Sequence, residues 1–133
     1  MPGNFVDTNV LLYSFGLEQG KRSRVIEILL DQPVLTVQVL NESAQVMRKK
    51  FGFTGETIQA FHAGWVLGAK IHPLSLSTVH RALELGDRLG YSHYDSLIIA
   101  SALEAGCDIL YSEDMQHNHR IDGALTIVNP FAA

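Results

Sequence analysis

The chain has 133 residues, about the length of one domain, and 47% of them are hydrophobic. Its 14 acidic and 10 basic residues give a net charge of −4, which excludes a protein that grips nucleic acid through a broad positive surface. No apolar run approaches the roughly 20 residues of a membrane-spanning helix, no secretory signal is visible, and the single Cys107 cannot form an internal disulfide. We therefore expect one cytoplasmic domain over residues 1–133, without a membrane contact.

In the first part of the chain, short apolar runs alternate with helical patterns. We expect a strand over residues 4–6, a turn into a helix over 10–15, a helix over 21–30, a strand over 34–37 and a helix over 39–50. This places Asp7 at the end of the first strand and Glu42 near the first turn of the last helix, where the helix dipole favours a negative charge. The order is that of a strand–helix–strand unit.

The rest of the chain continues the alternation. We expect a helix over residues 54–68, an extended segment over 71–74, a helix over 77–89, a helix over 92–106, a strand over 108–111, a polar loop over 112–123 and a strand over 125–128. Ser92 and Asp95 have the spacing of a capping box at the start of their helix. Strands that alternate with helices predict an α/β fold, a three-layer α/β/α sandwich with a mainly parallel central sheet.

Four acidic residues lie where a predicted strand ends or a predicted helix begins: Asp7, Glu42, Asp95 and Asp114. The carboxyl edge of a parallel sheet would gather them, and that edge is where α/β folds bind ligands. Carboxylates are the ligands that Mg²⁺ and Mn²⁺ prefer, and such ions can activate a water and neutralise charge during phosphodiester hydrolysis. The pattern therefore predicts a divalent-metal site that cuts nucleic acid.

Short polar side chains adjoin two of these acids. Thr8 and Asn9 follow Asp7, and Ser112 comes shortly before Asp114. Hydroxyl and amide groups in such places can orient a carboxylate or a metal-bound water, so we assign them a supporting role.

Each acid also has a purely structural interpretation. Asp95 and Glu42 could serve only as favourable charges in the first turns of their helices, and Asp7 could serve only as a helix cap. Asp7 is the hardest of the three to explain in this way, because it would lie at the ligand-binding edge of the sheet.

The four acids lie in four longer segments: Phe-Val-Asp-Thr-Asn-Val-Leu-Leu-Tyr at 5–13, Val-Gln-Val-Leu-Asn-Glu at 37–42, Tyr-Asp-Ser-Leu-Ile-Ile-Ala at 94–100 and Leu-Tyr-Ser-Glu-Asp-Met at 110–115. These segments resemble the PIN-domain ribonucleases, in particular the toxin subunits of VapBC-type toxin–antitoxin pairs. The resemblance runs across nearly the whole chain. It implies a PIN-like fold and a metal-dependent endoribonuclease that is silenced by a small antitoxin protein and often forms a homodimer.

The resemblance also assigns roles to residues. It implies that Asp7, Glu42, Asp95 and Asp114 bind Mg²⁺ or Mn²⁺, and that Thr8 and Ser112 occupy supporting hydroxyl positions. Some relatives carry a further acid or Asn just after the fourth acid, where this chain has residues 116–118, Gln-His-Asn. Housekeeping nucleases share the same acids, so the toxin role rests on the resemblance alone.

Basic residues that could contact RNA fall into three places: Lys21, Arg22 and Arg24; Arg48, Lys49 and Lys50; and Arg120. Short basic runs of this kind also occur as solvated helix faces. We interpret His117 and His119 as loop residues in solvent, because a zinc site usually recruits His or Cys in a tighter spacing.

Two other functions compete with the nuclease. A PIN-fold module could bind RNA or a protein without cutting, although it would not need all four acids. A phosphohydrolase could use Asp7 as a covalent nucleophile, but it would need an Asp-x-Asp start where this chain has Asp7-Thr8-Asn9.

Overall fold

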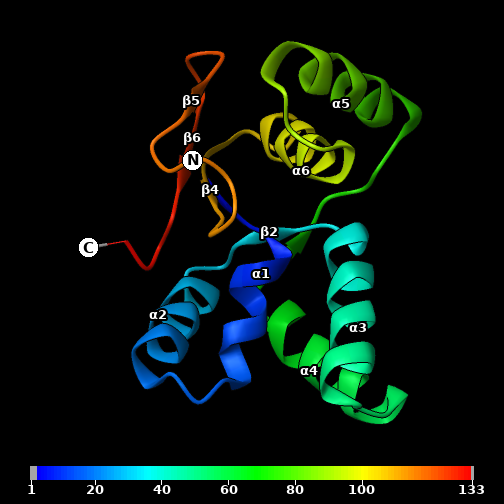
Figure 1. Ribbon diagram of the computed structural model, residues 1–133, viewed down its shortest axis with the longest axis vertical. Helices are drawn as coiled ribbons and strands as arrows, with labels where there is room; N and C mark the ends of the chain where they lie inside the picture. Colours follow the sequence, from blue (N-terminus) through cyan, green and yellow to red (C-terminus); the bar gives the residue numbers. More distant parts are fainter. Residues whose placement is uncertain (1–2, 133) are drawn as a thin grey trace.

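The computed structural model describes residues 3–132 and confirms the three-layer α/β/α sandwich (Figure 1). The strands are β1 (Gly3–Val6), β2 (Val34–Leu35), β3 (Lys70–Ile71), β4 (Cys107–Tyr111), β5 (Arg120–Ile121) and β6 (Leu125–Val128). The helices are α1 (Thr8–Leu11), the 3₁₀ helix η1 (Leu12–Phe15), α2 (Gln19–Leu30), α3 (Val37–Phe51), α4 (Gly55–Val66), α5 (Leu76–Leu89) and α6 (His93–Glu104).

The strands form one sheet in the order β3-β2-β1-β4-β6-β5, and every neighbouring pair is parallel except β5 with β6. The chain builds outward from β1 to β3 and then returns to β4 on the other side of β1. Because such crossovers are right-handed, this reversal sends the returning helices to the opposite face. Figure 1 shows α5 and α6 on the other side of the sheet from α1 to α4. The reversal point lies between β1 and β4, where α/β folds bind ligands beyond the strand ends.

The central strands are apolar because both of their faces are covered. Phe5, Val6, Leu35 and Leu110 are completely buried in one continuous core, as expected for parallel strands between two helical layers. Cys107 is buried in this core, and burial raises the pKa of its thiol to about 11.

Side-chain caps start the helices that approach the site. Thr36 accepts a hydrogen bond from the backbone N–H of Val39 at the start of α3, and Ser92 accepts one from Asp95 at the start of α6. The second of these confirms the predicted cap. At the other end of α3, Gly52 takes a left-handed conformation with φ of 64°, which glycine adopts without strain.

Three sequence expectations were wrong in detail. The strand expected over 34–37 ends at Leu35, because Thr36 caps α3 and Val37 already belongs to the helix. That earlier start puts Glu42 in the second turn of α3, not in the first. The loop expected over 112–123 contains β5, whose Arg120 and Ile121 pair antiparallel with β6.

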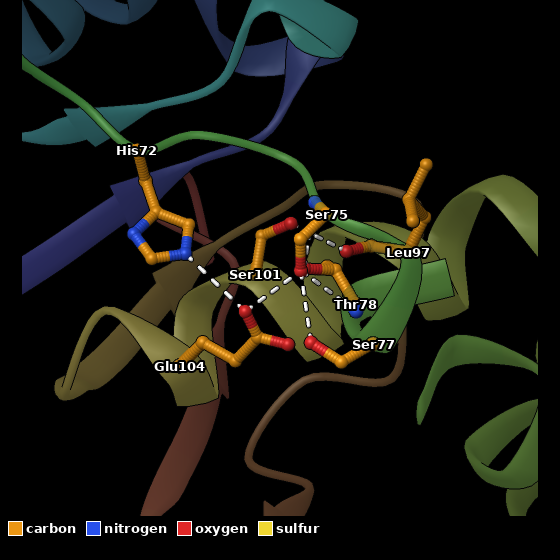
Figure 2. Close-up of polar contacts among 7 residues, drawn as sticks. All are labelled: His72, Ser75, Ser77, Thr78, Leu97, Ser101 and Glu104. Atoms are coloured by element: carbon orange, nitrogen blue, oxygen red, sulfur yellow. Dashed lines mark hydrogen bonds and ion pairs between the residues drawn. The ribbon is translucent and has the colours of Figure 1, made fainter. Parts of the chain in front are cut away.

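A hydrogen bond between Thr78 and Glu104, here called the polar staple, joins α5 to α6, the helix that carries Asp95 (Figure 2). Glu104, the last residue of α6, accepts a hydrogen bond of 2.9 Å from the buried Thr78 hydroxyl and lies 3.5 Å from His72 Nε2. Thr78 is also the third residue of a capping box with Ser75 at the start of α5. The staple therefore fixes the end of α6 that lies opposite Asp95.

Candidate functional site

Asp7 is the buried centre of the candidate site. It directly follows β1, caps α1 and is only 4% exposed. One carboxylate oxygen accepts the backbone N–H of Thr8 at 2.7 Å, and the other accepts the Ser112 hydroxyl at 2.9 Å and the Asn9 amide at 3.4 Å. Ser112 follows β4, so the neighbouring parallel strands β1 and β4 bring together two residues 105 positions apart. The carboxylate is thus held in one orientation at the reversal point of the sheet.

The environment of Asp7 resists its ionisation. Burial raises the pKa of this carboxyl to about 7, and the nearby negative charges of Asp95 and Glu42 add to the effect. The hydrogen bonds from Ser112 and Thr8 act in the opposite direction but do not cancel it. A bound cation would relieve both the burial cost and the repulsion between the acids.

Glu42 reaches the site from α3. Its carboxylate is partly buried and accepts a hydrogen bond of 3.3 Å from Gln38, one turn earlier in the helix. Burial raises the pKa of Glu42, and the charge of Asp95 raises it further. Thr8 is the first residue of α1, and its hydroxyl donates to the carbonyl oxygen of Val39 in α3 at 3.4 Å. Thr8 therefore joins the segment after β1 to the helix that carries Glu42.

Asp95 and Asp114 complete the acidic cluster from the opposite side. Asp95 lies in the first turn of α6, and its pKa is raised by burial and by the nearby charge of Asp114. Asp114 is exposed, in the loop after β4, between Glu113 and the buried Met115. The fold thus brings Asp7, Glu42 and Asp95 within electrostatic reach of one another and Asp114 within reach of Asp95, although the four acids come from four separate segments.

The carboxylate oxygens of these four acids are suitable ligands for a hard divalent cation. The acids are too far apart, however, to surround an ion completely. Within residues 3–132, no three His, Cys, Asp or Glu side chains lie close enough together to hold a metal ion between them. Mg²⁺ commonly binds through one or two carboxylates and keeps several waters, so an open cluster of this kind suits it. Asp7 and its neighbours would hold the ion partly through water.

The sequence did not point to one prominent contact beside the cluster. Glu113 accepts the Tyr13 hydroxyl at 2.6 Å and pairs with Lys21 at 2.9 Å. Although burial acts to raise its pKa, these two hydrogen bonds lower the pKa of Glu113. Its backbone N–H donates to Asn9, the residue whose side-chain amide also reaches Asp7. No local pattern could reveal this contact, because Tyr13 and Lys21 are 100 and 92 positions away.

Some of the basic residues expected to contact RNA are already engaged by other protein groups, and some are not engaged within the part of the chain that the structure describes. Lys21 is paired with Glu113, Arg24 lies 3.8 Å from Glu27, and Arg120 donates to Thr126 and Gly123 within the β5–β6 hairpin. Arg22 donates to the carbonyl oxygen of Gly16 at 3.4 Å. Arg48, Lys49 and Lys50 occupy the exposed last turn of α3 and form no ion pair within residues 3–132.

The two loop histidines make contacts that favour a structural role. His117 accepts a hydrogen bond from the backbone N–H of Asn129 through Nδ1, and His119 Nδ1 lies 2.7 Å from the Tyr91 hydroxyl. Both contacts attach the loop after Asp114 to the rest of the domain. The finding agrees with our interpretation of these residues as parts of a loop, but it places His119 partly buried and not free in solvent.

Solved structures that share this fold include the following two. The VapC20 toxin of Mycobacterium tuberculosis, which cleaves the sarcin–ricin loop, is 18% identical with a TM-score of 0.68, and the match covers 84% of this chain and 89% of that one. A toxin–antitoxin complex from Klebsiella pneumoniae contains a chain that is 20% identical with a TM-score of 0.69, and the match covers 98% of this chain and 99% of that one. No curated protein matches the sequence significantly. Within residues 3–132, no helix is both long and apolar enough to cross a membrane.

The PIN domain family model matches residues 5–122, a range that includes all four acids and Ser112. The match covers most of the sequence and agrees with the resemblance in the four segments and with the observed fold. The chain therefore belongs to the PIN domain family.

Proposed function

We propose that this chain is a Mg²⁺- or Mn²⁺-dependent endoribonuclease and the toxin of a type II toxin–antitoxin pair. The observation that carries the proposal is the buried Asp7 carboxylate at the reversal point of a PIN-family sheet. Burial and the charges of Asp95 and Glu42 raise its pKa, and the charge of Asp114 helps to raise that of Asp95. Such crowding of like charges is expected where a cation binds.

In this proposal the four acids bind the ion, and their polar neighbours orient the acids. Asp7 would bind the cation, with Glu42, Asp95 and Asp114 as further ligands, directly or through water. Ser112 and the Thr8 N–H keep the Asp7 carboxylate oriented through hydrogen bonds of 2.9 and 2.7 Å. When bound, the metal would supply an activated water and neutralise charge at the scissile phosphate. In-line hydrolysis of this kind leaves 5′-phosphate and 3′-hydroxyl ends.

The structure favours the nuclease over the covalent phosphohydrolase. Both carboxylate oxygens of Asp7 already accept hydrogen bonds, and the side chain is only 4% exposed. A nucleophile must present a free oxygen to its substrate, whereas a metal ligand can keep such hydrogen bonds, which then orient it. Asn9 also stands where the phosphohydrolase would need a second Asp.

The last turn of α3 is the best candidate for an RNA contact. Lys49 lies two helical turns beyond Glu42 on the same side of α3, which places its backbone roughly 10 Å farther along the helix axis. An RNA strand with its scissile phosphate at the acids could therefore lay a neighbouring phosphate against this basic turn. The −4 net charge of the chain makes such a local contact more important.

An apolar groove of about 290 Å³ opens beside Asn9 between η1 and α3, and it supports an antitoxin partner. Its walls include the fully exposed Leu17 and the half-exposed Phe51, with Lys50 at the rim. An amphipathic antitoxin segment could cover these apolar side chains and extend past Asn9, whose amide contacts Asp7, to block the acids. One of the two similar structures is a toxin–antitoxin complex, which agrees with this partner. A homodimer and action in the cytoplasm remain predictions.

Sequencing of RNA ends in cells that express the chain without its partner tests the proposal. We expect growth arrest and new 5′-phosphate ends at a few discrete sites. Both effects should be lost in Asp7→Asn. Both should persist in Asp87→Asn, a control that makes the same chemical change on the exposed surface of α5. Cyclic-phosphate ends would contradict hydrolysis by a metal-bound water. Unchanged RNA that co-purifies with the folded protein would favour the non-cutting RNA-binding module.

A further inference from the structure

Asp114 is the one member of the acidic cluster on an exposed loop, yet both of its neighbours are tightly held. Met115 is 4% exposed, and its N–H donates to Ser112 at 3.3 Å. On the other side, Glu113 turns away from the cluster and points toward η1 and α2, where it meets Tyr13 and Lys21. The position of Asp114 therefore depends on how firmly these neighbours hold the loop.

Both carboxylate oxygens and the backbone N–H of Glu113 make hydrogen bonds. Oε1 accepts the Tyr13 hydroxyl at 2.6 Å, Oε2 accepts Lys21 Nζ at 2.9 Å, and the backbone N–H donates to Asn9 at 3.2 Å. Lys21 and Glu113 are 27% and 25% exposed, so solvent screens this pair less than it screens a surface pair. Charged hydrogen bonds at such distances are the strong ones.

The partners of Glu113 are themselves fixed. Lys21 Nζ lies 4.3 Å from the centre of the Tyr13 ring and 5.1 Å from that of Phe131, and the Tyr13 and Phe131 rings meet edge to face at 5.0 Å. The C-terminal segment thus packs over the cation and the phenol that hold Glu113. Two distant segments thus meet at the Glu113 carboxylate, and the C-terminal segment packs against both of them.

From this geometry we infer that Glu113, Lys21 and Tyr13 form a latch that positions Asp114 for metal binding. The inference rests on the proposed function, because it assigns a task to the metal ligands. It makes Glu113 a positioning residue, not a ligand, and it gives Lys21 a task other than the RNA contact expected from the sequence. Asn9 extends the latch to Asp7, since its amide joins the Glu113 backbone to the Asp7 carboxylate.

Removing the charge of Lys21 distinguishes two explanations of its effect on metal binding, one through the position of the loop and one through electrostatic repulsion of the cation. If Lys21 acted only through its charge, its removal would make the site more negative and would strengthen the binding of a cation. If Lys21 acts through the latch, its removal frees Glu113 and the loop, and cation binding weakens. Tyr13→Phe removes one contact of the latch without any change of formal charge. The two explanations therefore predict opposite signs for Lys21→Met.

The test is calorimetric titration of Mn²⁺ alone into the purified full-length protein. We expect Lys21→Met, Glu113→Gln and Tyr13→Phe each to weaken Mn²⁺ affinity, by roughly 10-fold for the first two, the lower end of the usual effect of groups that orient metal ligands. Lys21→Arg should restore near-normal affinity, and Lys70→Met, which removes a positive charge from the exposed edge strand β3, should leave it unchanged.

Two further results decide the inference. Lys21→Met with Glu113→Gln should weaken affinity no more than the worse single variant, because both remove the same contact. Circular dichroism must show each variant folded. Affinity that is unchanged or tighter in a folded Lys21→Met protein would overturn the latch, while the proposed function would stand. A wild-type protein that binds no Mn²⁺ would instead overturn the metal site, and the latch with it.

Discussion

Replacing Asp7 by Asn should make the metal-free protein more stable at alkaline pH. Burial, with the charges of Asp95 and Glu42, raises the pKa of Asp7 to about 7 in the folded protein, against 3.8 for an ordinary Asp carboxyl. Below pH 4 the carboxyl is protonated in both the folded and the unfolded chain. Between pH 4 and 7 only the folded chain keeps the proton, so the free energy of unfolding falls as the pH rises.

The difference of about 3 pH units, at about 1.4 kcal/mol each, corresponds to about 4 kcal/mol. Asn cannot ionise, so Asp7→Asn escapes this loss, although it also changes the hydrogen bonds with Ser112 and Asn9. The pKa of about 7 already includes the preference of these hydrogen bonds for the ionised carboxylate, so what remains of this second effect is the same at every pH. The stability of the variant relative to the wild type should therefore rise by about 4 kcal/mol between pH 4 and pH 8, which is on the order of 10 °C in melting temperature.

Urea unfolding of both proteins at several pH values in EDTA measures this difference, because titrations common to both proteins cancel. Mn²⁺ added at pH 8 should then stabilise the wild type, by about 2.7 kcal/mol at 100 times its Kd, and should stabilise Asp7→Asn much less. Parallel pH profiles for the two proteins would refute the reasoning, since they would show that Asp7 ionises normally in the fold.

Three smaller predictions follow from single contacts. Ser112→Ala removes the 2.9 Å hydrogen bond to the buried Asp7 and should lower the unfolding free energy at pH 8 by about 1–3 kcal/mol in urea titrations, with a smaller loss at pH 4. Glu104→Ala removes the partner of the buried Thr78 hydroxyl and should cost about 1–2 kcal/mol, while calorimetry should find Mn²⁺ affinity unchanged. Lys49→Met, made in an Asp7→Asn background to prevent cutting, should weaken RNA binding in filter-binding assays. The slope of log affinity against log salt concentration should fall by about one phosphate contact. An unchanged slope would show that Lys49 does not contact the RNA.

The order of strands and helices was predictable because both faces of the sheet are covered. Central strands such as β1 and β4 appear in the sequence as short apolar runs, and the start of a helix such as α6 is marked by a cap residue such as Ser92. The boundary at Thr36 was wrong because Thr suits a strand as well as a helix cap. The hairpin that contains β5 was missed, although Asp122-Gly123 is a turn signal between its strands.

The candidate site was predictable only as a set of acids. Asp7, Asp95 and Asp114 stand at strand ends and helix starts, and topology alone brings such positions to one edge. Their spacing and protonation depend on burial and on neighbours such as Ser112, which is 105 positions from Asp7. The role of Glu113 was invisible for the same reason, since its partners come from elements that the sequence does not place beside it.

The most direct test of the central claim is cleavage of total cellular RNA by the purified, partner-free protein in Mn²⁺ or Mg²⁺, compared with EDTA and with the Asp7→Asn and Asp87→Asn variants. We predict discrete cuts with 5′-phosphate ends that require the metal, disappear in Asp7→Asn and persist in Asp87→Asn. Equal cutting by the wild type and Asp7→Asn, or no cutting by folded protein that calorimetry shows to bind Mn²⁺, would contradict the account.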